Sequence, residues 1–232
     1  FRRNKSFYIF KLRFRFNIMT NFIPVFPLSI VVYPGETLNL HIFEPRYKEL
    51  VMECVAAKKS FGIPTVINGK VSDMGTLVEI TEVAKEYDNG EMDIVTTGTT
   101  VFRVLEIIKS VPDKLYSGAI VNYPDNSQVY HKQELMQVLL KAVRELHRML
   151  NISKDFKKPD EELTAYDIAH HSGLSLEEEY ELLELLKEEQ RQEYLKRHFG
   201  KVLPVIMEME VLKERVKLNG HFKNLSSFRF GE

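Results

Sequence analysis

The sequence has almost no cysteine and no long apolar run. Cys54 is the single cysteine among 232 residues, so neither an internal disulfide nor a cluster of thiolate metal ligands can form. A reducing, cytoplasmic location is therefore the default expectation. No stretch reaches the roughly 18 consecutive apolar residues of a membrane-spanning helix, and we expect no membrane partner.

Motifs for catalysis and for cofactor binding are also missing. The segment GIPTVINGKV, residues 62–71, lacks the glycine spacing of a phosphate loop, and Val71 follows Lys70 where Ser or Thr is needed. Neither a G-x-S-x-G elbow nor an H-E-x-x-H zinc motif occurs. The sequence thus predicts no enzyme, no catalytic residue and no cofactor.

Histidine, cysteine and glutamate residues suggest metal sites that their spacing does not support. His170 and His171 are adjacent, so on a helix their rings diverge by about 100° and cannot hold one metal ion. The glutamates at 177–189 lack the glycine and spacing of a calcium loop and read as a solvated helix face. Cys54 is interpreted as a buried apolar residue. We predict no metal site, and a helix-end or partly buried position for the two histidines.

Positive charge is concentrated at the beginning of the chain. Residues 1–18 carry six basic side chains and no acid, which leaves −7 for the rest of a chain whose total is −1. This balance excludes a strongly nucleic-acid-seeking protein. We expect residues 1–21 to be a non-native or disordered extension, with translation starting at Met19; the alternative is a genuine basic arm.

Residues 22–124 show short strands with turn signals. Pro34-Gly35 predicts a turn, residues 36–43 alternate like a half-buried strand, and residues 44–59 have helical spacing. Further strands are predicted at 77–83, 92–97, 100–108 and 116–123, with a hairpin at Asp88-Asn-Gly90. The segment 101–108 is apolar on both faces, which is typical of an interior barrel strand.

Residues 125–220 read as helical, and residues 221–232 as a tail without a pattern. Helices are predicted at 131–150, at 160–171, after a capping box formed by Ser175 and Glu178, and at about 204–218. Gly200 and Pro204 predict that no single helix runs through this region. The last helix carries Val205, Met209, Leu212 and Val216 on one face, and so short a seam is expected to pack inside its own bundle.

One segment matches a known family. Residues 26–47, FPLSIVVYPGETLNLHIFEPRY, closely resemble the opening of the Lon protease N-terminal domain family, and weaker similarity extends to about residue 218. The positions that carry the motif are Pro27, Leu28, Pro34, Gly35, Leu40, Ile42, Phe43, Glu44, Arg46 and Tyr47. The ATPase and protease modules of full Lon proteases have no counterpart in this sequence, so the chain resembles a stand-alone member.

The resemblance implies an α+β fold in which a PUA-like β-barrel of about six strands, residues 22–124, precedes a helical bundle. It also implies a non-catalytic module that binds unfolded or client polypeptides, an adaptor in protein quality control that works with a separate ATPase or protease. The alternatives are a PUA-like RNA-binding protein and an ATP-dependent peptidase label inherited from the family name. RNA binding requires that basic residues such as Lys109, Lys114, Lys132 and Lys141 converge on one face.

The ten motif positions admit two roles. Glu44, Arg46 and Tyr47, together with the neighbouring His41, either stabilise the strand-to-helix corner, where a carboxylate is favourable at a helix N-terminus, or contact a peptide. We expect Arg46 to pair with an acid elsewhere in the barrel. The binding surface itself is expected to be an exposed apolar groove between barrel and helices, where a peptide adds a strand or buries side chains.

Overall fold

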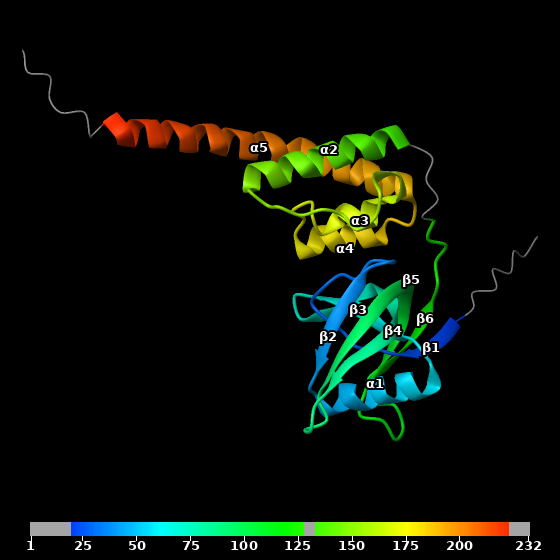
Figure 1. Cartoon of the computed structure of the whole chain (residues 1–232). Helices are drawn as coiled ribbons and strands as arrows, with labels where there is room; N and C mark the ends of the chain where they lie inside the picture. Colours follow the sequence, from blue (N-terminus) through cyan, green and yellow to red (C-terminus); the bar gives the residue numbers. More distant parts are fainter. Residues whose placement is uncertain (1–19, 128–132, 223–232) are drawn as a thin grey trace, which may run out of the picture.

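The structure is a computed structural model that describes residues 20–127 and 133–222, with side chains through Leu218. Six strands and α1 form one layer, and the later helices form a second layer against one end of it (Figure 1). The elements are β1 (Thr20–Pro24), β2 (Thr37–Ile42), α1 (Pro45–Ala57), β3 (Phe61–Ile67), β4 (Lys70–Glu86), β5 (Met92–Ile108), β6 (Gly118–Asn122), α2 (Gln133–Leu150), η1 (Asp160–Glu162), α3 (Ala165–Ala169), α4 (Leu176–Glu184) and α5 (Glu188–Phe222).

The strands form one antiparallel sheet that curls into a barrel. Its order is β1-β6-β5-β4-β3, and β2 pairs with the first half of β5. Parallel bridges from Val25 to Gly62 and from Leu28 to Thr65 join the β1 side to β3. Register shifts along the β4–β5 pair bend these two strands. The predicted α+β fold with a six-stranded barrel and following helices is confirmed.

The strand predictions were partly correct. The segments 92–97 and 100–108 are one strand, β5, which continues through Gly98. It pairs with β4 from Met92 to Arg103, and with β2 and β6 on its other side. The expectation that 101–108 is an interior strand is therefore confirmed only as far as Arg103, since among the described strands residues 104–108 pair with β6 alone. The missed strand β3 joins β4 through Asn68 and Gly69, both with positive φ, and an Asn-Gly pair is a standard hairpin signal.

The predicted helix at 160–171 is divided into the 3-10 helix η1 and the five-residue α3 by extended backbone at Leu163 and Thr164. The helical prediction also failed in α5. Gly200 and Pro204 lie inside α5, a single helix of 35 residues, so the predicted break is wrong. Leu195, Phe199, Leu203 and Ile206 of α5 pack into the main helical core, and this burial outweighs the helical hydrogen bond that Pro204 cannot make. The capping box of Ser175 and Glu178 is confirmed at the start of α4.

The barrel and the helices share a hydrophobic core. Val31, Tyr33, Met74 and Val101 of the barrel belong to the same buried cluster as the helical residues. A second cluster, containing Leu50 and Ile94, lies between α1 and the sheet. Burial of continuous apolar area across the junction fixes the orientation of the two layers.

Two sequence expectations remain open. The division at residues 124 and 125 falls in the link between β6 and α2 and stays a prediction. The basic segment 1–18 lies outside the described residues, whereas Thr20 and Asn21 begin β1. Among the described helices, none combines the length and apolar character needed to cross a membrane.

Candidate functional site

A groove of about 500 Å³ lies where the barrel meets the helices. Residues 30–38 line it from the barrel, and residues 154–158 and 163–171 line it from the segment between α2 and the end of α3. We call it the barrel–bundle groove. It is the kind of hollow between barrel and helices that the sequence led us to expect.

A tight turn forms the barrel wall of the groove. Pro34 and Gly35 occupy its centre, Gly35 has φ +85°, and the Glu36 amide donates to the Tyr33 carbonyl at 3.1 Å. This is the arrangement of a type II turn, which needs positive φ at its third position. The Gly35 amide donates to the Gly98 carbonyl and the Gly98 amide donates to the Glu36 carbonyl, each at 2.8 Å, so β5 holds the turn in place.

Stacked tyrosines form the floor of the groove. Tyr33 is 1% exposed, and its ring lies 4.8 Å from that of Tyr166 on α3. The Tyr33 hydroxyl donates to the Glu179 carbonyl at 2.9 Å. Burial, reinforced by the nearby Glu179 carboxylate, raises the pKa of Tyr33, so its hydroxyl stays protonated as a donor. The stack thereby joins the barrel turn to α3 and α4.

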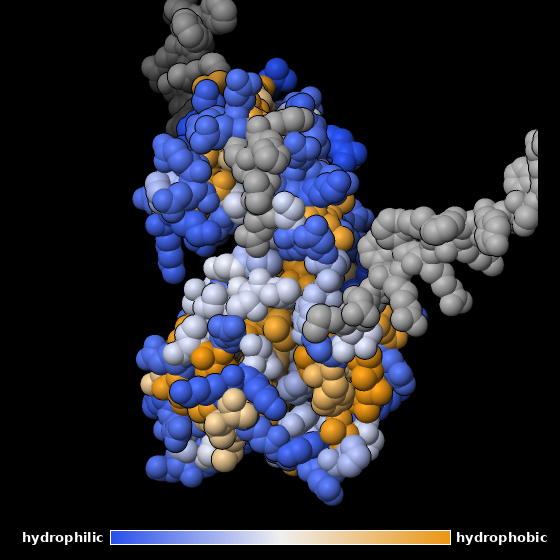
Figure 2. Space-filling model, turned by 90° about the vertical axis from the view of Figure 1, so that its right-hand side faces the viewer, coloured by the Kyte–Doolittle hydropathy of each residue, from blue (hydrophilic) through white to orange (hydrophobic). Residues whose placement is uncertain are grey.

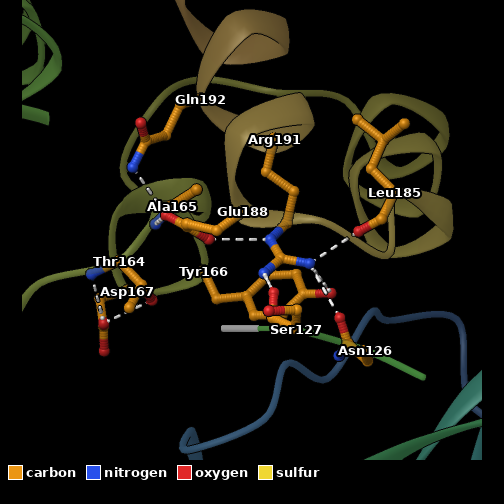
Figure 3. A network of polar contacts seen from close by, with 10 residues as sticks. All are labelled: Asn126, Ser127, Thr164, Ala165, Tyr166, Asp167, Leu185, Glu188, Arg191 and Gln192. Atoms are coloured by element: carbon orange, nitrogen blue, oxygen red, sulfur yellow. Dashed lines mark hydrogen bonds and ion pairs between the residues drawn. The ribbon is translucent and has the colours of Figure 1, made fainter. Parts of the chain in front are cut away.

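A buried ion pair supports Tyr166 from behind (Figure 3). The Arg191 guanidinium lies 4.1 Å from the Tyr166 ring centre and pairs with Glu188 at 2.9 Å, with both side chains 0% exposed. Arg191 also donates to Asn126, Ser127, Tyr166 and Leu185 oxygens. Glu188 accepts from the Ala165 amide at 2.7 Å. These contacts fix the barrel-to-helix link, α3 and the start of α5 relative to one another.

His170 bridges the two layers beside the tyrosines. Its Nδ1 lies 2.7 Å from a Glu179 oxygen and its Nε2 lies 3.2 Å from a Glu36 oxygen. Burial lowers the pKa of His170, but hydrogen bonds with Glu179 and Glu36 outweigh it and raise the pKa to about 9. At neutral pH His170 is therefore a cation held between two carboxylates.

The helical wall carries more positive than negative charge. Lys154, Lys157 and Lys158 line it, and Lys158 pairs with Asp167 at 2.6 Å. The neighbouring His171 is neutral, because burial and the Lys154 charge lower its pKa to about 4. The floor is closed to a ligand, because Tyr33 and Tyr166 are 1% and 3% exposed. The apolar lining that a ligand can reach comes from half-buried side chains such as Ile30, Leu38 and Phe156. With the polar rim, this suits a ligand with apolar side chains and a polar backbone.

β2 begins at the groove, where Thr37 and Leu38 line it, and continues beyond it with one edge open. Within the described residues, β5 is the one strand that pairs with β2. Because the Gly98 amide bonds the Glu36 carbonyl, the alternation of an antiparallel pair turns the backbone groups of Thr37, Asn39 and His41 away from β5. An exposed row of unpaired backbone groups is a template for another strand.

The structure separates the ten motif residues instead of gathering them. Pro34 and Gly35 alone line the groove. Ile42 and Tyr47 are buried in the α1 core, and the Leu28 carbonyl accepts from the Val66 amide at 2.8 Å where the barrel closes. Pro27 and Leu40 are half-buried.

The other three motif residues lie at the corner between β2 and α1. Phe43 is 58% exposed. Arg46 pairs with Glu44 at 2.7 Å and stacks on Tyr47 at 4.5 Å, so its acid is its neighbour and not one elsewhere in the barrel. The peptide-contacting role of these residues stays a prediction.

Several residues of the groove escaped the sequence reasoning. Tyr33 and Tyr166 sit in unremarkable apolar patterns, and Arg191 lies in the charged run EEQRQ, which has no signal that distinguishes a buried arginine from a solvated one. His170 was placed correctly at a helix end, as the C-cap of α3, but its two carboxylate partners are 9 and 134 residues away.

Another hollow and an exposed apolar patch lie apart from the junction of barrel and helices. A hollow of about 480 Å³ lies between the end of α1 and β4, and no residue of α2 to α5 lines it. Figure 2 shows hydrophobic side chains at the barrel surface on the side that carries β1 and β6, where Phe22 and Leu105 are about half exposed. No cluster of three or more potential metal ligands occurs within residues 20–127 and 133–222.

Comparison with known proteins identifies the fold. The family model of the ATP-dependent protease La (LON) substrate-binding domain matches residues 23–198. The Lon N-terminal domain protein from Xanthomonas campestris is 27% identical, with a TM-score of 0.57, and the match covers 76% of this chain and 98% of that one.

A second solved structure shows the same fold at lower identity. The N-terminal domain of the Mycobacterium avium complex Lon protease is 15% identical, with a TM-score of 0.55, and the match covers 78% of this chain and 100% of that one. Because the family model matches residues 23–198, from β1 to the first third of α5, the chain belongs to the family of LON substrate-binding domains.

Proposed function

We propose that the protein is a non-catalytic module that binds extended polypeptide segments along the open edge of β2 and in the barrel–bundle groove. In the cell it would act as a cytoplasmic adaptor that presents unfolded clients to a separate ATPase or protease. The observation that carries the proposal is the open edge of β2, whose first residues line the barrel–bundle groove. The name of the matching family, a substrate-binding domain, supports the same class of ligand.

The open edge supplies affinity that does not depend on the client's sequence. A peptide strand beside β2 would pair its backbone with the groups that Thr37, Asn39 and His41 turn away from β5. Alternate side chains of such a strand would then face the groove. Its volume of about 500 Å³ is within the range of ligand clefts, so it can take a few apolar side chains.

The test is fluorescence anisotropy of a labelled, permanently unfolded polypeptide titrated with the protein. We expect saturable binding with a dissociation constant in the range of about 1–100 µM, typical of transient recognition by strand addition. A failure to bind any unfolded polypeptide in this range contradicts the proposal.

A matched pair of variants locates the site. Asn39→Pro removes a backbone N–H that faces solvent and is tolerated at a sheet edge, whereas Asn39→Ala changes only the side chain. We expect Asn39→Pro to weaken binding about 10-fold or more and Asn39→Ala to leave it within about 2-fold. Equal affinities for the two variants would place the binding site elsewhere.

Labelled RNA is the parallel titration. Lys114 pairs with Glu53 on α1 at the end of the barrel far from the helices, whereas Lys141 lies on α2 (Figure 1), so these two basic residues do not share a face. Lys132 lies outside the described residues. RNA binding that weakens with salt would favour the RNA-binding alternative over the adaptor.

A further inference from the structure

The second half of α5 exposes an apolar seam. The helix extends past the end of α2 (Figure 1). The four seam residues are Val205 (56% exposed), Met209 (64%), Leu212 (59%) and Val216 (62%). The expectation that this seam packs inside its own bundle is therefore wrong. Ile206 and Leu203, on another face of the same helix, make the contacts with the core.

The spacing of the seam reads the same in both directions. The intervals between its residues are four, three and four. In an antiparallel pair of identical helices, Val205 of one copy therefore lies opposite Val216 of the other, and Met209 lies opposite Leu212. These are the layers of a short antiparallel coiled coil, and a two-fold symmetric interface needs this self-complementarity.

Two charges beside the seam complement each other in the same arrangement. Glu208 and Arg215 lie seven residues apart beside Leu212 of the seam, and the described part of the chain gives neither of them an ion-pair partner. Their neighbours are paired within the helix, Glu210 with Lys213 at 3.0 Å and Glu214 with Lys217 at 2.6 Å. Antiparallel pairing places Glu208 opposite Arg215 twice, once on each side of the two-fold axis. A parallel pair would place Glu208 opposite Lys213, which already pairs with Glu210, and would leave Arg215 opposite Gly220.

We infer that this face of α5 is the contact between two copies of the chain, which pair antiparallel through residues 205–216. Four apolar residues from each copy leave water in the dimer, and the antiparallel orientation is favoured because it alone pairs Arg215 as well as Glu208. The interface uses neither the barrel–bundle groove nor the edge of β2, so both copies keep their grooves free.

The test is sedimentation equilibrium of the 232-residue chain and of three variants. We expect Glu208→Arg and Arg215→Glu to weaken the dimer about 10-fold each, since each places like charges opposite each other at two symmetric positions. An equimolar mixture of these two variants is expected to form a heterodimer with about the affinity of the unaltered chain, because every facing pair is then of opposite charge.

The control is Glu177→Arg, the same charge change at an exposed position of α4; it is expected to leave the dimer unchanged. Thermal unfolding followed by circular dichroism checks that each variant folds. A chain that stays monomeric up to about 100 µM overturns the inference. A dimer that ignores both single substitutions, or a mixture that stays monomeric, overturns it as well.

Discussion

Arg191 and Glu188 are charged residues whose side chains are fully buried, and each is the counter-ion of the other. Removing one partner leaves an uncompensated buried charge, which costs about 3–5 kcal/mol. We expect Arg191→Met to lower the free energy of unfolding by about that amount, because Glu188 keeps its contacts with the Ala165 amide and Gln192 but loses its counter-ion. Urea unfolding followed by circular dichroism measures the loss.

The double variant Glu188→Gln with Arg191→Met separates pairing from packing. A neutral pair of similar volume removes both charges, so we expect it to recover at least half of the loss. A double variant that is less stable than Arg191→Met would show that the hydrogen bonds of Glu188, and not its charge, are what matter.

His170 and His171 predict a maximum in stability near pH 6.5. Relative to the unfolded value of about 6.5, the pKa of His170 is raised to about 9. Its contribution is therefore complete below pH 6.5 and is lost as the pH rises through 9. The pKa of His171 is lowered to about 4, so the unfolded chain takes up a proton first and stability falls between pH 6.5 and 4.

Two variants test the two sides of the stability maximum separately. With allowance for the 31% exposure of the His170 side chain, we expect about 1–2 kcal/mol to be lost between pH 6.5 and 9.5 in the unaltered chain. In His170→Gln this loss should disappear, and in His171→Gln the loss between pH 6.5 and 5 should shrink. Denaturant midpoints measured across pH give both slopes, and parallel curves for all three proteins would contradict the assignment.

Single residues were predictable where their cause is local. Cys54 is buried as its helical spacing indicates, and Ser175 and Glu178 form the capping box that their three-residue spacing predicts. Arg191 was not predictable, because its partners Asn126 and Tyr166 come from distant segments and nothing in EEQRQ reports them.

At the scale of elements, the turn at residues 33–36 crosses β5 at very close range, and the point of contact is Gly98. A Cβ atom on Gly98 would lie 2.3 Å from the Tyr33 carbonyl oxygen. We expect Gly98→Ala to lower the free energy of unfolding by about 2–3 kcal/mol, because the new Cβ would force the Tyr33 backbone to move and would press on the Thr76 methyl group. Peptide binding should weaken with it, since the turn is the barrel wall of the groove.

Gly69→Ala is the comparison for this prediction. Gly69 has φ +74° and open space around it, so only the strain of positive φ is added, about 1 kcal/mol. Thermal unfolding of both variants measures the difference. If Gly98→Ala were as stable as Gly69→Ala, the turn at residues 33–36 would be able to move away from the new Cβ without a loss in the free energy of unfolding.

Elements were predictable where the pattern is strong and local. The strand at 36–43 and the helix at 44–59 appear as β2 and α1, because alternation and helical spacing are read directly from the residues. The length of β5 and the continuity of α5 were not predictable. In the sequence alone, Gly98 indicates the end of a strand and Pro204 the end of a helix. Contacts with neighbouring strands and with the helical core keep both elements continuous.

At the scale of the molecule, the sequence motif identified the fold but not the groove. Eight of the ten motif residues build the barrel or its corner, so the match reports the scaffold. The groove depends on how the helical layer sits on the barrel. That orientation comes from Val31, Tyr33, Met74 and Val101 entering the helical core, contacts between segments more than 30 residues apart that no local pattern contains.

The shared core predicts that the two layers unfold together. Amides of β4 and α4 should exchange with solvent hydrogen through the same global opening, because the Tyr180 hydroxyl accepts from the Met74 amide at 3.0 Å and Tyr33 is stacked between the layers. Native-state hydrogen exchange measures both sets of amides. In Tyr33→Ala, which removes the stack at a cost of about 3–5 kcal/mol, the amides of α4 should become less protected than those of β4. Different opening free energies for the two layers in the unaltered chain would show that the helices are an independent unit, and the groove would then be a hinge instead of a fixed site.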